Sequence, residues 1–182
     1  VVLVIGATGR TGGPILAALG DDYRIRALVR DLDRARAKLP ANVTLFPGDV
    51  RQPETLTSAF EGARFVVSAV GARFVGKGDL ADPMNTTELV DYEGVKHLAG
   101  AARSAGVEHF VLVSAMGVTR LGGAHDRMDN IMHWKLKGEN ALRASGVPYT
   151  IVRPGGLTDE AGGTLGTLVT QGDNHGPGLT NR

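Results

Sequence analysis

The sequence has 182 residues, a formal net charge of +1 and no cysteine, which excludes disulfides, thiolate chemistry and a strongly basic nucleic-acid surface. No apolar run approaches the roughly 20 residues that span a bilayer, and no basic signal-peptide segment opens the chain. We therefore expect one cytoplasmic domain over residues 1–182, with small-molecule partners and no direct contact with nucleic acid or membrane.

Apolar, β-branched runs alternate along the chain with amphipathic segments. The apolar runs predict strands at residues 1–5, 25–29, 43–46, 65–70, 110–114 and 149–152. The amphipathic segments predict helices at residues 13–19, 33–39, 53–60, 87–104 and 128–145. Strands that are apolar on both faces are typical of parallel sheets covered by helices. The alternation therefore predicts a Rossmann-type, doubly wound parallel sheet in three α/β/α layers.

The segments between these elements carry signals of their own. Pro14 fits the first turn of a helix, and Gly106 and Gly146 fit left-handed helix C-caps. Residues 71–83 and 117–127 are glycine-rich and follow strand ends, where open α/β sheets bind ligands, so we expect loops bordering a site. The first of them could equally be a surface excursion. Because the chain opens inside a strand and ends in a polar stretch, we expect the sequence to be incomplete, at its C-terminus in particular.

Glycines are spaced by three residues between the first predicted strand and the first helix. Gly6 would let the chain leave the strand, Gly9 would let backbone approach a pyrophosphate, and Gly12 would let helix and strand pack closely. The helix N-terminus then offers free N–H groups to an anion. We therefore expect a dinucleotide phosphate site formed by Gly6, Ala7, Thr8, Gly9, Arg10, Thr11 and Gly12.

The choice of cofactor depends on the end of the second predicted strand. Arg30 stands where an NAD site usually has Asp or Glu for the ribose hydroxyls. A guanidinium there, with Arg10 approaching from the other side, suits a 2′-phosphate, so the expected cofactor is NADP (NADPH). Asp31 either caps the next helix or binds the ribose. The two arginines could instead be solvated surface residues.

Residues after the third and fourth predicted strands extend the expected groove. Asp49, next to Val50, either accepts from the adenine amino group or caps the helix that opens near Pro53. Small residues at the end of the fourth strand would let backbone lie against ribose, or they only pack in the core. These residues are Ser68, Ala69, Val70 and Gly71.

Taken together, the segments GATGRTGG, VRD, PGDVRQPETL, VDYEGVKHLAGAARSAGVEHFVLVSAMG and LRASGVPYTIVRPGGL resemble the atypical short-chain dehydrogenase/reductase superfamily, specifically its NmrA-like branch. The resemblance covers nearly the whole chain. It implies an NADP-binding Rossmann domain, with Ser114 and Lys135 near the nicotinamide and with Pro154 and Gly155 on its carboxamide side. Further residues, including a helix, usually follow in this branch, so part of the substrate side is expected beyond Arg182.

The best-known short-chain dehydrogenases pair a Tyr with a Lys four residues later and a Ser at the end of the fifth strand. Ser114 and Lys135 match two of these positions, but Ile131 stands where the Tyr would be. We expect Ser114, Lys135 and His133 to be the catalytic candidates, with His133 as a substitute proton donor. Other candidate substitutes are Tyr92, His125 and Asp126. Asp91 replaces an Asn that those families use to anchor a water.

Three functions remain open on the sequence. The first is an NADPH-dependent reductase for a small flat acceptor, such as a quinone, flavin or tetrapyrrole, with the proton taken from water. The second is a non-catalytic, NmrA-like sensor of NADP(H). The third is a sugar-nucleotide epimerase-like enzyme, whose chemistry depends on the missing Tyr. No metal site is expected, and the predicted helices at 87–104 and 128–145, which include Trp134, are candidates for a homodimer interface.

Overall fold

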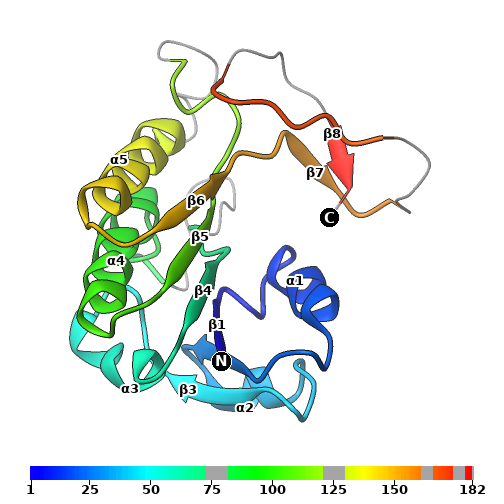
Figure 1. The fold of residues 1–182 in the computed structure, drawn as a ribbon, viewed down its shortest axis with the longest axis vertical. Helices are drawn as coiled ribbons and strands as arrows, with labels where there is room; N and C mark the ends of the chain where they lie inside the picture. Colours follow the sequence, from blue (N-terminus) through cyan, green and yellow to red (C-terminus); the bar gives the residue numbers. More distant parts are fainter. Residues whose placement is uncertain (73–81, 121–129, 161–165, 174–178, 182) are drawn as a thin grey trace.

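The described part of the chain forms a parallel sheet of six strands in the order β3-β2-β1-β4-β5-β6 (Figure 1). The computed structural model describes residues 1–72, 82–120, 130–160, 166–173 and 179–181. The strands are β1 (Val2–Ile5), β2 (Ile25–Val29), β3 (Thr44–Pro47), β4 (Phe65–Ser68), β5 (His109–Val113) and β6 (Tyr149–Val152). The order reverses direction between β1 and β4, and ligands bind beside such a reversal in open α/β sheets. The predicted Rossmann-type sheet is confirmed.

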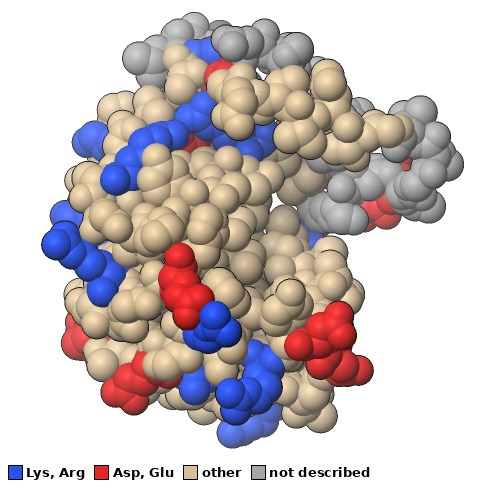
Figure 2. All heavy atoms as spheres, viewed as in Figure 1, with Lys and Arg blue, Asp and Glu red and all other residues tan. Residues whose placement is uncertain are grey.

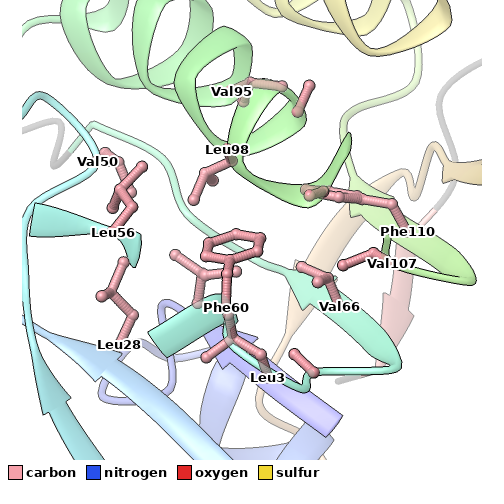
Figure 3. Packing of buried hydrophobic residues seen from close by; sticks show 14 of the residues in the cluster. Leu3, Leu28, Val50, Leu56, Phe60, Val66, Val95, Leu98, Val107 and Phe110 are labelled. Atoms are coloured by element: carbon pink, nitrogen blue, oxygen red, sulfur yellow. The ribbon is translucent and has the colours of Figure 1, made fainter. Parts of the chain in front are cut away.

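Helices cover both faces of this sheet and complete the predicted three layers (Figure 1). On one face, Leu16 and Ala35 pack against Val4 of β1. On the other face, Phe60 and Leu98 pack around Phe110 of β5 in the larger apolar cluster (Figure 3). The helices on the first face are α1 (Gly12–Leu19) and α2 (Leu32–Arg36), and those on the second are α3 (Thr57–Phe60), α4 (Val95–Ser104) and α5 (Ile131–Ala144).

The register of the sheet brings the ends of the central strands to one edge. β1 pairs in parallel with β2 and β4, so that Ile5 lies opposite Leu28 on one side and Ser68 on the other. Because parallel strands end at the same edge, the segments that follow β1, β2 and β4 leave the sheet together. This edge carries the site described below.

Two predicted helices differ from the observed ones. The predicted helix at 87–104 opens with a π-helical segment, η2 (Glu88–Gly94), before α4 begins. At the end of η2, Gly94 packs closely on Val50, since a Cβ there would lie 2.8 Å from a methyl carbon of that residue. The predicted helix at 53–60 is a 3-10 turn, η1 (Pro53–Thr55), followed by the single turn of α3. Residues 128–129, where the last helix was predicted to begin, lie outside the described residues.

The end predicted for the helix at 33–39 is wrong, because α2 stops at Arg36, but the predicted helix-opening proline and glycine C-caps are confirmed. Pro14 lies in the first turn of α1, and Gly106 and Gly146 have φ angles of 67° and 80°. After β6 the chain adds a small parallel pair, β7 (Gly156–Thr158) and β8 (Leu179–Asn181), which the sequence did not predict. Strands of three residues are too short to show a period in the sequence.

The described surface carries charges of both signs. Figure 2 shows Lys and Arg interspersed with Asp and Glu on the viewed face. Among the described residues, no helix has the length and apolar character that crossing a membrane requires. Likewise, the described residues contain no group of three His, Asp or Glu that could hold a metal ion.

Candidate functional site

A groove opens at the carboxyl ends of β1, β2 and β4, where the strand order reverses. It brings together many of the residues that the sequence singled out: Gly6, Thr8, Gly9, Arg30, Asp49, Val50, Ala69, Val70 and Gly71. Its other lining residues are Ile5, Leu28, Val29, Gly48, Arg51, Asn85 and Val90. The groove therefore has the position that the Rossmann fold gives a nucleotide.

The glycine turn at one wall of the groove leaves no room for side chains. Gly6 has a φ of 81°, and a Cβ on it would lie 2.7 Å from the carbonyl oxygen of Ala69. A Cβ on Gly12 would lie 2.1 Å from the carbonyl oxygen of Gly6, so α1 packs directly on the turn. The N–H of Gly9 donates to that same oxygen at 2.9 Å. At the start of α1, Thr11 makes no side-chain cap, which leaves the helix N-terminus available to an anion.

The two arginines expected to flank a 2′-phosphate lie apart in the structure. Arg30 borders the groove and its Nη1 donates to Asp82 at 3.2 Å. Arg10 instead pairs with Asp159, which follows β7, and its side chain is largely exposed. Asp31 caps α2 by accepting from the N–H of Arg34 at 3.0 Å, which is the first of its two predicted roles. Arg30 is therefore the predicted cation that the structure places at the groove.

Asp49 is held by Arg51, a residue that the sequence analysis did not single out. Its carboxylate accepts from the backbone N–H of Arg51 at 3.0 Å and from the guanidinium at 2.5 Å. Burial alone would raise the pKa of Asp49, but the hydrogen bonds from Arg51 outweigh it and lower that pKa. The cap of η1 that was one prediction for Asp49 does not form, because the N-cap position is Gln52. Arg51 lies two residues after Asp49 in the sequence, and this short spacing was the signal that could have predicted the ion pair.

Lys135 and Asp91 form an ion pair beside Gly71, one of the residues that line the groove. The Lys135 Nζ lies 2.7 Å from Asp91 Oδ1, and the Asp91 side chain is 1% exposed. Asp91 Oδ2 accepts from the N–H of Ala72 at 2.9 Å. A Cβ added to Gly71 would lie 3.3 Å from Asp91 Oδ1 and 3.7 Å from Lys135 Nζ, so both charged groups lie beside the groove.

Ser114 follows β5 and lies beside a buried carboxylate. Glu139, on α5, is fully buried and accepts from Arg143 at 2.8 Å and from Arg153 at 2.6 Å. Burial raises the pKa of Glu139, but hydrogen bonding from Arg153, Ser114 and Arg143 more than compensates and lowers it. Ser114 Oγ is close enough to favour the charged carboxylate, yet it makes no hydrogen bond of ordinary geometry among the described residues.

His133, the predicted substitute proton donor, does not meet Lys135 at the groove. Two residues apart on an α-helix correspond to a rotation of about 200°, so the two side chains point to nearly opposite faces. His133 is exposed and contacts the edge of Trp134, which stacks on Tyr92 with ring centroids 5.9 Å apart. The alternative donors His125 and Asp126 lie outside the described residues. Of the candidate donors that the structure describes, neither His133 nor Tyr92 lines the groove.

The remaining predicted residues lie around the groove but do not line it in the described part of the chain. Ser68 is buried in the sheet, and Ala7 is buried in the core beneath the glycine turn. Pro154 accepts from the N–H of Met116 at 2.8 Å, which ties the segment after β6 to the segment after β5, and Gly155 follows it. The cofactor contacts expected at these residues stay predictions.

The groove fits a dinucleotide on its own geometry. The turn between Gly6 and Gly12 is a backbone cradle that a Cβ would fill, at an α-helix N-terminus without a side-chain cap. Ser114 Oγ is buried without a hydrogen bond of ordinary geometry among the described residues, as expected of a group that meets a polar ligand, and Ser68 Oγ is buried in the same way. Asp91 Oδ1 has the Lys135 ammonium as its ion-pair partner. Such a groove on such a sheet defines a dinucleotide-binding protein.

The chain belongs to the NAD(P)H-binding family, whose profile matches residues 6–182. It is 33% identical over 205 residues to sanguinarine reductase of Eschscholzia californica, covering 94% of this chain and 75% of the relative. It is 37% identical over 188 residues to an uncharacterised chloroplastic protein of Arabidopsis thaliana, covering 94% of this chain and 58% of that protein. The cytoplasmic location expected from the sequence stays a prediction.

The solved structures include a cofactor complex. Triphenylmethane reductase of Citrobacter sp., complexed with NADP(H), is 26% identical with a TM-score of 0.65, covering 87% of this chain and 50% of the other. The resemblance to atypical short-chain dehydrogenases and reductases is thereby confirmed, as is the assignment of an NAD(P)H cofactor.

Proposed function

We propose that the protein is an NADPH-dependent reductase that passes hydride to a small flat acceptor, such as a quinone, a flavin or a tetrapyrrole. The observation that carries the proposal is a groove lined by the glycine turn, Arg30 and Asp49, with the ion pair of Lys135 and Asp91 beside its lining residue Gly71. Arg30 binds the 2′-phosphate, and Lys135 binds the hydroxyls of the nicotinamide ribose. Asp49, which follows β3 and whose carboxylate is fixed by Arg51, would accept from the adenine amino group.

The absence of a Tyr at position 131 restricts the chemistry. When bound, NADPH supplies the hydride, which carries two electrons and one hydrogen to the acceptor. Ser114 stabilises the negative charge that develops on the acceptor, and water supplies the proton that completes the reduction. An electron-deficient acceptor of this kind takes up hydride once it is correctly oriented against the cofactor, without a strong acid to protonate it first. An Ile at position 131 is therefore compatible with turnover.

The relatives support a reductase over the alternatives. Sanguinarine reductase and triphenylmethane reductase are both reductases by name, and the second acts on an acceptor with aromatic rings. A non-catalytic NADP(H) sensor is the second candidate, because no side chain of the described residues replaces the missing Tyr.

Turnover tests the proposal directly. NADPH consumption, followed by its absorbance, is measured against a panel of quinones, flavins, bilins and simple carbonyls. The Lys135→Met variant is expected to lose at least about tenfold in turnover, whereas Lys137→Met, whose ammonium lies over the exposed side of Trp134, keeps the wild-type rate. Tight NADPH binding without turnover on any acceptor would replace the reductase with the sensor.

Cofactor preference is tested by Arg30→Asp. NADPH affinity is expected to fall at least about tenfold, since a hydrogen bond to a charged group contributes about 1.5–3 kcal/mol, while NADH affinity is retained. Arg36→Asp is the matched control, because Arg36 pairs only with Asp33 on the exposed face of α2 among the described residues. Equal losses for both cofactors would remove Arg30 from the phosphate site.

A further inference from the structure

Four charged side chains form a continuous series of ion pairs along the rim of the groove, in the order Arg30, Asp82, Arg51 and Asp49. Asp82 accepts from Arg30 at 3.2 Å, and both of its oxygens accept from Nη1 of Arg51 at 2.9 Å. The two guanidiniums and two carboxylates sum to zero charge. A 2′-phosphate, with a charge of about −1.5 to −2, therefore meets a carboxylate already placed between the arginines.

The two carboxylates of this series are not held equally. The Asp49 side chain is 14% exposed and is bound by the backbone and the guanidinium of Arg51. The Asp82 side chain is 31% exposed, and it accepts from one nitrogen of Arg30, from a single nitrogen of Arg51 and from the N–H of Met84. Because ion pairs open to water contribute little, Asp82 is the carboxylate that an incoming dianion displaces.

We propose that Asp82 determines how strongly the protein prefers phosphorylated adenosine, by competing with the 2′-phosphate for Arg30 and Arg51. In the free protein the Asp82 carboxylate lies between the two guanidiniums, and on binding the phosphate takes its place. This inference rests on the proposed function, in which NADPH is the cofactor. A cofactor without the 2′-phosphate leaves Asp82 where it is, so the competition weakens NADPH binding and spares NADH.

The proposal predicts a gain of affinity on removing the competitor. Dissociation constants for adenosine 2′,5′-bisphosphate and adenosine 5′-monophosphate are measured by titration calorimetry with the whole chain and no acceptor. Asp82→Asn is expected to tighten the bisphosphate by about fivefold, the effect of freeing arginines that are otherwise engaged about four-fifths of the time, and to leave the monophosphate unchanged. Asn keeps an oxygen for the N–H of Met84, so the local turn is retained.

Two further variants separate competition from general electrostatics. Asp33→Asn removes the same charge from an exposed site on α2 that contacts neither Arg30 nor Arg51, and it should change neither affinity. In an Arg30→Ala background the effect of Asp82→Asn should shrink, because Asp82 then has one guanidinium fewer to release. Thermal unfolding of each variant establishes that the fold is intact.

Three results would overturn the proposal. Unchanged affinities in Asp82→Asn, with a bisphosphate preference that still falls in Arg30→Ala, reject the competition and leave the proposed function standing. A weaker bisphosphate affinity in Asp82→Asn means that Asp82 positions the arginines for the phosphate instead of competing with it. No bisphosphate preference in the wild type or in any variant rejects both the competition and the assignment of NADPH.

Discussion

The ammonium of Lys135 lies 2.7 Å from Oδ1 of Asp91, while the other oxygen of that carboxylate accepts from the N–H of Ala72. One buried carboxylate thus connects η2, α5 and the segment that follows β4. In the best-known short-chain dehydrogenases the lysine has a tyrosine nearby, whereas here Ile131 takes that place. Asp91 is the group that holds the Lys135 ammonium in place beside the groove.

Breaking this pair is expected to destabilise the fold. Asp91→Asn should lower the free energy of unfolding by about 3 kcal/mol, because it leaves the Lys135 ammonium without a counter-charge where only 16% of its side chain is exposed. The double variant Asp91→Asn/Lys135→Met should recover most of the loss. Urea unfolding of the wild type, both single variants and the double variant measures the coupling, and strictly additive losses would show that the two groups do not interact.

Removing the Ser114 hydroxyl is expected to affect turnover more than binding. Ser114→Ala should leave the NADPH dissociation constant within about threefold of wild type and lower reductase turnover at least about tenfold, as loss of one oxyanion donor does. Ser68→Ala is the control for loss of a buried hydroxyl, because Ser68 is also buried and its Oγ also has no hydrogen-bond partner among the described residues. A wild-type rate in Ser114→Ala would exclude Ser114 from the reaction.

The glycine turn offers a pair of adjacent substitutions with opposite expectations. A Cβ at Gly12 would lie 2.1 Å from the carbonyl oxygen of Gly6, whereas a Cβ at Gly13 has nothing within 4 Å. Gly12→Ala should therefore push α1 off the turn and weaken NADPH binding at least about tenfold, while Gly13→Ala should bind normally. Calorimetric titration with NADPH checks both, and equal affinities would mean that the close contact does not shape the phosphate cradle.

Acid should destabilise the protein partly through Glu139. Its folded-state pKa lies below the usual value of 4.5, so its stabilising contribution is complete above that pH and is lost as the pH falls through the lowered value. Glu139→Gln should cost about 3 kcal/mol at neutral pH, because Arg153 and Arg143 lose their partner. Its stability should also depend less on pH below 4.5. Unfolding free energies from pH 7 to pH 3 test this, and parallel pH curves would contradict it.

Much of the fold was readable because its signals are local and repeated. The sheet follows from runs such as residues 1–5, whose side chains are buried on both faces, and the glycine turn follows from spacing alone. The π-helical opening of η2 could not be predicted, because apolar spacing along residues 87–104 indicates a helix without distinguishing a π-helical turn from an α-helical one. The pair β7 and β8 joins segments too far apart in the sequence and too short to show a pattern.

The charged groups of the site show where sequence reasoning stops. Arg30 and Asp49 were found because their positions follow strand ends. The partners of these two residues were not predicted. Asp82, which pairs with Arg30, lies 52 residues away in the sequence, and Arg51, which pairs with Asp49, is one of many arginines with no distinguishing motif. The prediction that His133 faces the groove with Lys135 was wrong, because an α-helix places residues two positions apart on different faces, and His133 is exposed.

α5 crosses η2 in close backbone contact, beside the ion pair of Lys135 and Asp91. At Gly138 the two backbones approach so closely that a Cβ would lie 2.2 Å from the carbonyl oxygen of Asp91. This close contact holds α5 and η2 backbone to backbone beside the ion pair of Lys135 and Asp91. Among the described residues, the ion pairs of Asp82 at the groove rim have no such backbone contact between them, and water competes with partly exposed pairs of this kind. The two charged groups beside the groove therefore differ in how firmly the backbone behind them is held.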